Sequence, residues 1–192
     1  MRWPKGFTPP KSPQVDWEQL FANVNQDNSS WLDPSAGGKL RQVADFGVNP
    51  GGLAMFTHVP ETLPANAPLV VVLHGCGQSA AAYDRGAGWS TLADRFGFVV
   101  LAPEQNRTKH LNGCFNWFLP GDTTRGGGEA ASIRQMVAHA VATHGLDPQR
   151  VYVTGLSAGG GMTSAMLAAY PEVFAGGAII AGLPYGAAST VQ

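Results

Sequence analysis

The stretch VYVTGLSAGGGM, residues 151–162, decides the fold. Val151 to Thr154 is a short apolar, β-branched run, which is typical of a strand buried in a parallel sheet. From Ser157 the sequence has a helical pattern, which Pro171 ends. The GLSAG string, residues 155–159, therefore lies on a strand-to-helix turn, which is the setting that a nucleophile elbow requires.

Ser157 is the candidate nucleophile of this turn. In an elbow the serine has strained backbone geometry, and the glycines on either side of it avoid clashes with the neighbouring chain. The alternative is a glycine-rich helix start that packs on the sheet or cradles a phosphate. A P-loop needs a Gly-Lys-Ser/Thr ending, but no lysine follows Lys109, and the turn does not supply the Gly-x-Gly-x-x-Gly of a dinucleotide site.

A second turn supports the first. The apolar run Leu69 to Leu73 leads directly into the string HGCG, residues 74–77. Ester hydrolysis builds negative charge on a carbonyl oxygen, which the backbone N–H after the nucleophile and one N–H from this early loop can stabilise. We expect the N–H groups of Cys76 and Ala158 to be these oxyanion donors. Taken alone, the HGCG string is more typical of a plain β-to-α turn, and only its pairing with the elbow favours the oxyanion role. We interpret His74 as structural rather than as a base.

Strands and helices alternate along the rest of the chain. Arg41 to Val48 and Leu53 to Val59 flank a turn-forming NPGG string and predict an antiparallel hairpin. Further apolar runs and helical patterns follow, at Leu69 to Leu73, Trp89 to Phe96, Phe98 to Leu101, Glu129 to His144 and Ala178 to Ala181. This alternation predicts the α/β class, with a mostly parallel sheet, helices on both of its faces and the hairpin at its N-terminal side.

A chain of 192 residues is long enough for one well-buried domain. The first residues, Met1 to Pro13, hold four prolines without periodicity, so we expect residues 1–38 to be a poorly ordered arm and residues 39–192 to be the folded domain. With 12 basic against 13 acidic residues and scattered lysines, the chain has no basic stripe, which argues against nucleic acid as a partner. It has no apolar run of membrane-spanning length, and the first thirty residues lack the apolar core of a signal peptide.

The two cysteines, Cys76 and Cys114, match no zinc spacing, so the sequence predicts no metal site. Their spacing leaves open whether they form a disulfide or are two buried thiols.

Several stretches resemble one family of esterases. LVVVLHGCGQ (69–78), CFNWF (114–118) and the run from VYVTGLSAGGG to AGLPYG (151–186) are similar to the poly(3-hydroxybutyrate) depolymerase family, in the broader group that includes feruloyl and acetylxylan esterases. The resemblance covers roughly residues 39–186. It implies an α/β-hydrolase fold and a serine-dependent carboxylic ester hydrolase that works through an acyl-enzyme, without a cofactor, on a small acyl ester or a polyester. It also implies an extracellular or periplasmic protein, although the missing signal peptide leaves the cytoplasm open.

The resemblance extends to individual residues. Because it implies an oxidising compartment and both cysteines follow strands at the same edge of the sheet, we expect a Cys76–Cys114 disulfide. Asn116 and Trp117 are candidates for the substrate site, although an aromatic run is as often part of the core. Separately from the resemblance, we interpret Arg125, Glu129 and Arg134 as a charge cluster on or near the long helix, a solvated or structural pairing rather than a catalytic one.

The sequence departs from the family in its last part. The acid and the histidine of the triad follow the serine in this fold, but residues 158–192 contain one acid, Glu172, and no histidine. His139 and His144 lie toward the end of a helix that runs to the opposite edge of the sheet. His74 and His110 follow strands that end near the correct edge and are the alternative in-chain bases, but neither position supplies the histidine in the fold that the chain resembles. We therefore expect the triad acid and histidine, and the last strands of the fold, to lie outside this chain, which alone would be nearly inactive. The alternative is a non-catalytic binding or assembly module on the same scaffold.

Overall fold

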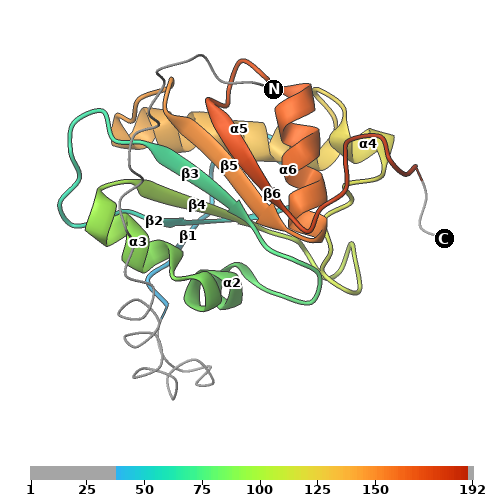
Figure 1. The fold of residues 1–192 in the computed structure, drawn as a ribbon, viewed down its shortest axis with the longest axis horizontal. Helices are drawn as coiled ribbons and strands as arrows, with labels where there is room; N and C mark the ends of the chain where they lie inside the picture. The colour runs from blue at the N-terminus through green and yellow to red at the C-terminus, as the bar shows by residue number, and fades with distance from the viewer. Residues whose placement is uncertain (1–37, 190–192) are drawn as a thin grey trace, which may run out of the picture. The chain divides into compact units, whose positions relative to one another are not determined.

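The structure, a computed structural model, describes residues 38–189, so the arm predicted for residues 1–38 lies outside it except for Gly38. Within this range six strands form one sheet in the order β1-β2-β4-β3-β5-β6 (Figure 1). β1 and β2 pair in antiparallel fashion, β2 is antiparallel to β4, and the other pairs are parallel. The strands are β1 (Arg41–Val43), β2 (Ala54–His58), β3 (Leu69–Leu73), β4 (Val99–Glu104), β5 (Val151–Leu156) and β6 (Gly176–Ile180).

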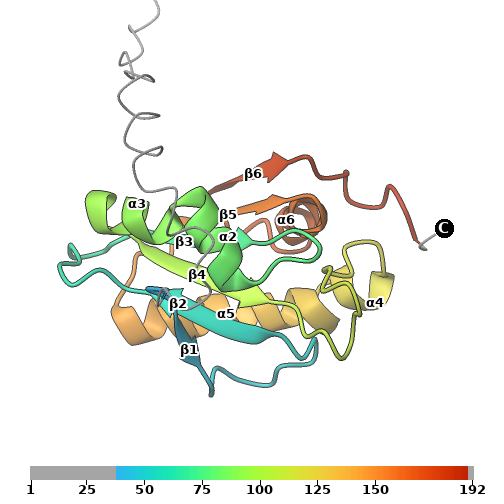
Figure 2. The same ribbon diagram turned by 90° about the horizontal axis from the view of Figure 1, so that it is seen from below.

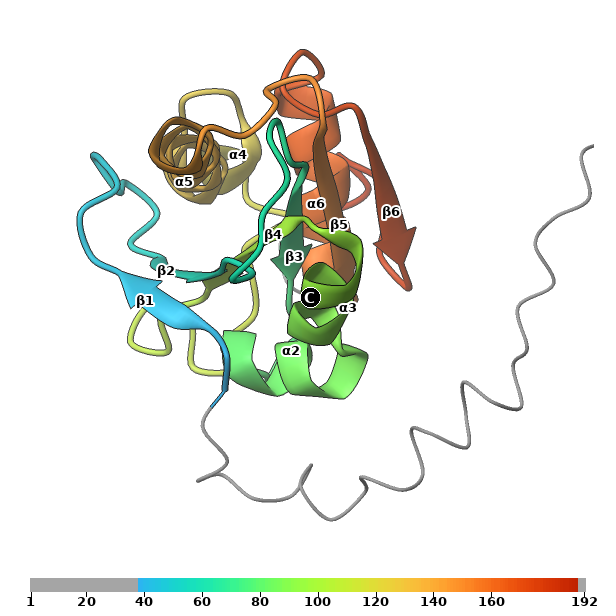
Figure 3. The ribbon, with the colours of Figure 1, turned by 90° about the vertical axis from the view of Figure 1, so that its left-hand side faces the viewer.

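Helices cover both faces of the sheet, as Figures 2 and 3 show. α2 (Ala80–Ala87) and α3 (Trp89–Phe96) lie on one face, and α5 (Gly128–His144) and α6 (Ala158–Ala169) lie on the other. The short α4 (Pro120–Thr123) precedes α5. Each face has its own apolar cluster, one built with Met136 and Met162 and the other with Tyr83 and Ala93. The predicted α/β class, with a mostly parallel sheet and an N-terminal hairpin, is confirmed.

The elements differ from the prediction in strand bounds and in two missed helices. β4 extends to Glu104 rather than to Leu101, and β6 is Gly176–Ile180 rather than Ala178 to Ala181. β1 ends at Val43 and not at Val48, because its pairing with β2 stops there and the following residues, apart from Phe46, are largely exposed. α2 was not predicted; the Ser79 hydroxyl caps it by accepting from the Ala82 N–H at 3.1 Å, and Gly88 closes it at φ 72°. The four-residue α4 was also missed, since one turn is too short to show periodicity.

β6 is the edge strand of the described sheet and pairs only with β5. Its apolar residues Ile179 and Ile180 are 45% and 46% exposed. The strand ends where Ala181 takes a positive φ of 49°, before the AGLPYG string leads away from the sheet.

Candidate active site

Ser157 has the strained backbone of the predicted elbow. Its φ is 56° and its ψ is −115°, a conformation that residues with a side chain rarely adopt. The strain is held by two backbone hydrogen bonds: the Ser157 N–H donates to the Ile180 carbonyl, and the Ser157 carbonyl accepts from the Gly161 N–H, both at 2.9 Å. The residue lies between β5 and α6 with an exposed side chain. Strain of this kind is found where a functional group must be presented.

The glycines beside Ser157 allow the turn to pack tightly. A Cβ atom on Gly155 would lie 2.3 Å from the carbonyl oxygen of Gly159. A Cβ atom on Gly159 would lie 2.1 Å from the carbonyl oxygen of Leu73 and would also overlap that of His74. Because these atoms belong to the backbone, they cannot move aside, and the elbow therefore rests directly on the end of β3.

The loop after β3 lies beside the serine. A Cβ on Gly75 would be 3.7 Å from the Cβ of Ser157. The Gly75 N–H is already used, since it donates to Gln78 Oε1 at 2.8 Å, and the Gly77 N–H donates to the Asn112 carbonyl at 2.7 Å. The Cys76 N–H between them donates to no acceptor within residues 38–189. Ala158 is the first residue of α6, where N–H groups have no partner inside the helix.

Cys76 and Cys114 form a disulfide in the structure. It joins the loop after β3 to the loop that carries Asn116 and Trp117. Trp117 is half-buried against the core and packs on α6, since a Cβ on Gly161 would lie 2.7 Å from the Trp117 Cγ. Trp117 therefore has the core role that the sequence left open for this aromatic run. The substrate role of Asn116 and Trp117 stays a prediction.

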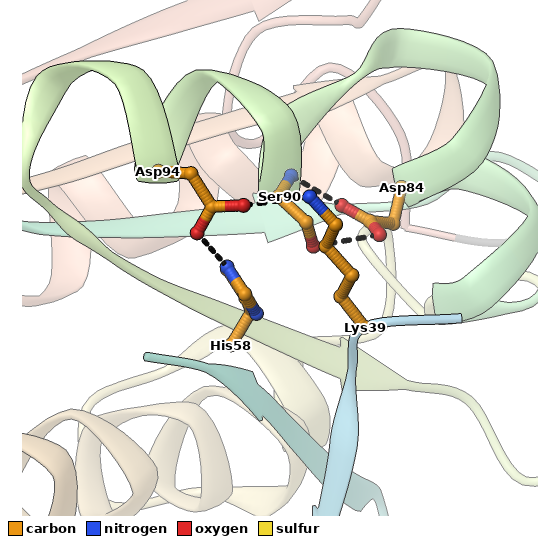
Figure 4. Close-up of polar contacts among 5 residues, drawn as sticks. All are labelled: Lys39, His58, Asp84, Ser90 and Asp94. Carbon is orange, nitrogen blue, oxygen red and sulfur yellow. Dashed lines mark hydrogen bonds and ion pairs between the residues drawn. The ribbon is translucent and has the colours of Figure 1, made fainter. Parts of the chain in front are cut away.

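Three of the described histidines make other contacts, and one of them is His110, in the loop after β4, whose Nδ1 accepts the Cys114 N–H at 3.5 Å. His74 is 1% exposed; its Nδ1 bonds the Gly75 carbonyl at 2.8 Å, and its Nε2 accepts the Gln105 N–H at 3.1 Å. Burial lowers the pKa of this imidazole, which favours the neutral ring. His58, at the end of β2 and beside the start of β4, bonds Asp94 of α3 (Figure 4), so it lies at the opposite end of the strands from Ser157. Within residues 38–189, the Ser157 hydroxyl has no side-chain hydrogen-bond partner.

The prediction that Glu129 belongs to a charge cluster is wrong. Glu129 is 1% exposed and accepts hydrogen bonds from the backbone and side chain of Asn116 and from the side chain of Gln105. Arg125 instead pairs with Glu172 at 2.6 Å on the surface. The signal was present in the sequence, because Glu129 shares the i, i+4, i+7 face of α5 with Ile133 and Met136, and both are fully buried.

Burial is the main reason why the pKa of Glu129 is raised to about 7, and the hydrogen bonds from Asn116 and Gln105 offset part of that rise. The carboxyl group therefore titrates near neutral pH inside the fold.

Residues 38–189 give no support for a metal site or for a membrane-spanning helix. This part of the chain has no group of histidine, cysteine, aspartate and glutamate side chains arranged to hold a metal ion. None of its helices combines the length and the apolar character that crossing a membrane requires.

Comparison with known proteins places these features in a family. The model of the esterase PHB depolymerase family matches residues 54–192. Poly(3-hydroxyalkanoate) depolymerase C of Paucimonas lemoignei is 59% identical over 152 residues, which are 79% of this chain and 36% of that protein. Acetylxylan esterase A of Aspergillus ficuum is 38% identical over 78% of this chain and 48% of its own length.

A solved structure agrees with these relatives. The acetyl xylan esterase from Aspergillus awamori superposes with a TM-score of 0.75 at 35% identity, over 80% of this chain and 55% of that one. The fold is thus that of the α/β-hydrolases. The chain spans between 36% and 55% of the length of these three proteins. The matches in sequence and in structure establish that the chain belongs to the esterase PHB depolymerase family.

Proposed function

We propose that the protein hydrolyses carboxylic esters through an acyl-enzyme, with Ser157 as the nucleophile. The observation that carries the proposal is the strained φ of 56° at an exposed serine between β5 and α6. A backbone in this region costs on the order of 1–3 kcal/mol and persists only where the surrounding structure imposes it. A serine that merely capped α6 would accept from the helix N–H groups, but the Ser157 side chain makes no such bond.

The chemistry follows from the groups around the serine. The Ser157 oxygen attacks the ester carbonyl while a base takes its proton, and the carbonyl oxygen becomes an oxyanion. The N–H groups of Cys76 and Ala158 stabilise this charge, and one such donor is worth about 3–4 kcal/mol in the transition state. Collapse expels the alcohol with a proton from the base, and water then releases the acid by the same route. No step calls for a cofactor.

The base comes from outside these 192 residues. Two observations support this part of the proposal. Both ring nitrogens of His74 are already bonded, and His58 lies at the opposite end of the strands from Ser157. The chain also spans less than half the length of its two sequence relatives.

A poly(3-hydroxyalkanoate) is the substrate that the comparisons favour, because the depolymerase is 59% identical and the acetylxylan esterase 38%. A small acyl ester of the acetylxylan or feruloyl type is the alternative. A disulfide between Cys76 and Cys114 supports an extracellular or periplasmic location, since such bonds persist in oxidising compartments.

The proposal is tested by fluorophosphonate labelling of the full-length protein. We expect labelling at Ser157 alone, and we expect Ser157→Ala to remove both labelling and turnover of p-nitrophenyl esters. Ser164→Ala is the matched control, because Ser164 lies on α6 and its hydroxyl accepts from the Tyr185 N–H at 2.8 Å. A scaffold without catalysis would leave the wild-type protein unlabelled, and a label that moved to Ser164 would refute the assignment.

A further inference from the structure

Glu129 is a buried carboxyl group that takes no part in the proposed chemistry. Its carboxylate lies in the first turn of α5 and receives three N–H donors. One Glu129 oxygen accepts the Asn116 N–H at 2.9 Å, and the other accepts the side-chain amides of Asn116, at 2.9 Å, and of Gln105. Burying a carboxylate is costly unless it is well bonded, so these three donors indicate a site built around an acceptor.

One series of contacts connects Glu129 to α6, the helix that follows Ser157. Its bond to the Asn116 N–H fixes the backbone immediately before Trp117. Trp117 packs on Gly161, whose N–H donates to the carbonyl of Ser157. The position of the loop that holds Asn116 and Trp117 is thereby tied to the first turn of α6.

A second series of contacts connects Glu129 to the loop after β3. Gln105 donates to Glu129 and also to the Cys114 carbonyl at 3.0 Å, and Cys114 is disulfide-bonded to Cys76. The Gln105 N–H is accepted by His74, whose other nitrogen bonds the Gly75 carbonyl. The proposed donor Cys76 is therefore held from both sides by residues that connect back to Glu129.

We propose that Glu129 is a positioning residue. Its carboxylate holds two loops in place beside Ser157: the loop after β3, which carries Cys76, and the loop that carries Asn116 and Trp117. This proposal rests on the proposed function. A carboxylate suits the role because it accepts bonds from both loops at once, whereas an amide would point its NH₂ at one of the three donors. An error of about 1 Å in such a site costs on the order of 10²-fold in rate.

The test is Glu129→Gln in the full-length protein, with Asp84→Asn as the matched control. Asp84 is also a buried carboxylate, 4% exposed, and accepts from the N–H and the hydroxyl of Ser90 where α2 meets α3 (Figure 4). Both variants lose a buried acceptor, but only Glu129 is connected to the loops beside Ser157. Turnover of p-nitrophenyl butyrate, the rate of fluorophosphonate labelling and the melting temperature are measured for both.

We expect Glu129→Gln to lower kcat by about 10- to 100-fold, with KM within about twofold and a parallel fall in the labelling rate, because the phosphonyl oxygen occupies the oxyanion position. We expect Asp84→Asn to lower the melting temperature and to leave kcat unchanged. If Glu129→Gln lowers only the melting temperature, Glu129 is a stabilising residue and the proposal is overturned.

Two further measurements keep the outcome clear. If Glu129→Gln does not fold, Gln105→Met removes the side-chain amide that bonds both Glu129 and the Cys114 carbonyl and keeps the Asn116 bonds. It should lower kcat by a smaller factor, and an unchanged kcat overturns the proposal. A wild-type protein that neither turns over esters nor labels at Ser157 refutes the proposed function itself. In that case the Asn116 amide proton, followed by NMR, should still titrate with Glu129, and a flat titration refutes the contact.

Discussion

Gly159 is the position where the elbow tolerates a side chain least. Its Cβ would overlap the carbonyl oxygens of Leu73 and His74, which are fixed in the backbone. We expect Gly159→Ala to lower the free energy of unfolding by about 3 kcal/mol or more and to abolish phosphonate labelling. The control is Gly86→Ala in α2, where nothing lies within 4 Å of the new methyl group. That variant should gain up to about 1 kcal/mol from helix propensity and keep its labelling rate. A Gly159→Ala protein that labels at the wild-type rate would refute the close contact.

Glu129 makes stability depend on pH in a defined direction. Its pKa is raised from 4.5 to about 7, so between these values the folded protein keeps a proton that the unfolded chain has released. The contribution of Glu129 to the free energy of unfolding therefore falls as pH rises from about 4.5 to 7 and is level above that range. The full contribution is at most about 3 kcal/mol.

The measurement compares urea unfolding of the wild type and of Glu129→Gln at pH 5 and pH 8. The wild type should lose more stability over this range than the variant, which has no carboxyl group to titrate. His74, whose pKa burial lowers, acts in the opposite direction below about 6.5, and it cancels because both proteins contain it. Equal slopes in the two proteins would show that Glu129 titrates normally in the fold.

At the level of elements, the Cys76–Cys114 disulfide joins the β3–α2 loop to the β4–α4 loop over a sequence separation of 38 residues. Closing a loop of this length in the unfolded chain corresponds to about 4 kcal/mol. We expect the double variant Cys76→Ala/Cys114→Ala to lose about 2–4 kcal/mol of unfolding free energy and part of its activity, because Cys76 is a proposed oxyanion donor. Peptide mapping without reduction should recover the two cysteines in one cross-linked species. Two freely alkylated thiols in protein purified from the medium or the periplasm would contradict the bond.

On the scale of the whole molecule, the proposal divides the catalytic groups, with the nucleophile and the oxyanion donors in this chain and the base outside it. We expect the isolated 192-residue chain to hydrolyse p-nitrophenyl esters far more slowly than the roughly 10 per second typical of enzymes, while the full-length protein reaches such rates. The oxyanion donors alone leave about 10³- to 10⁴-fold over the uncatalysed rate, and Ser157→Ala in each protein measures the background. A short chain with typical enzymatic turnover would place the base within these residues.

The sequence by itself determined the parallel strands, the helices α3, α5 and α6, and the elbow at Ser157. These features depend on local patterns: apolar runs, a 3.6-residue period, and glycines on either side of one serine. The tertiary structure alone decided which residues from different elements come into contact. The contacts among His74, Gln105, Asn116 and Glu129 join residues that are 13 to 31 positions apart in the chain, and they exist only because β3 and β4 end at the edge of the sheet where α5 begins. A hydrophobic pattern records which face of an element is buried, but the partners of a buried polar group are set by the register of the sheet and the packing of helices upon it.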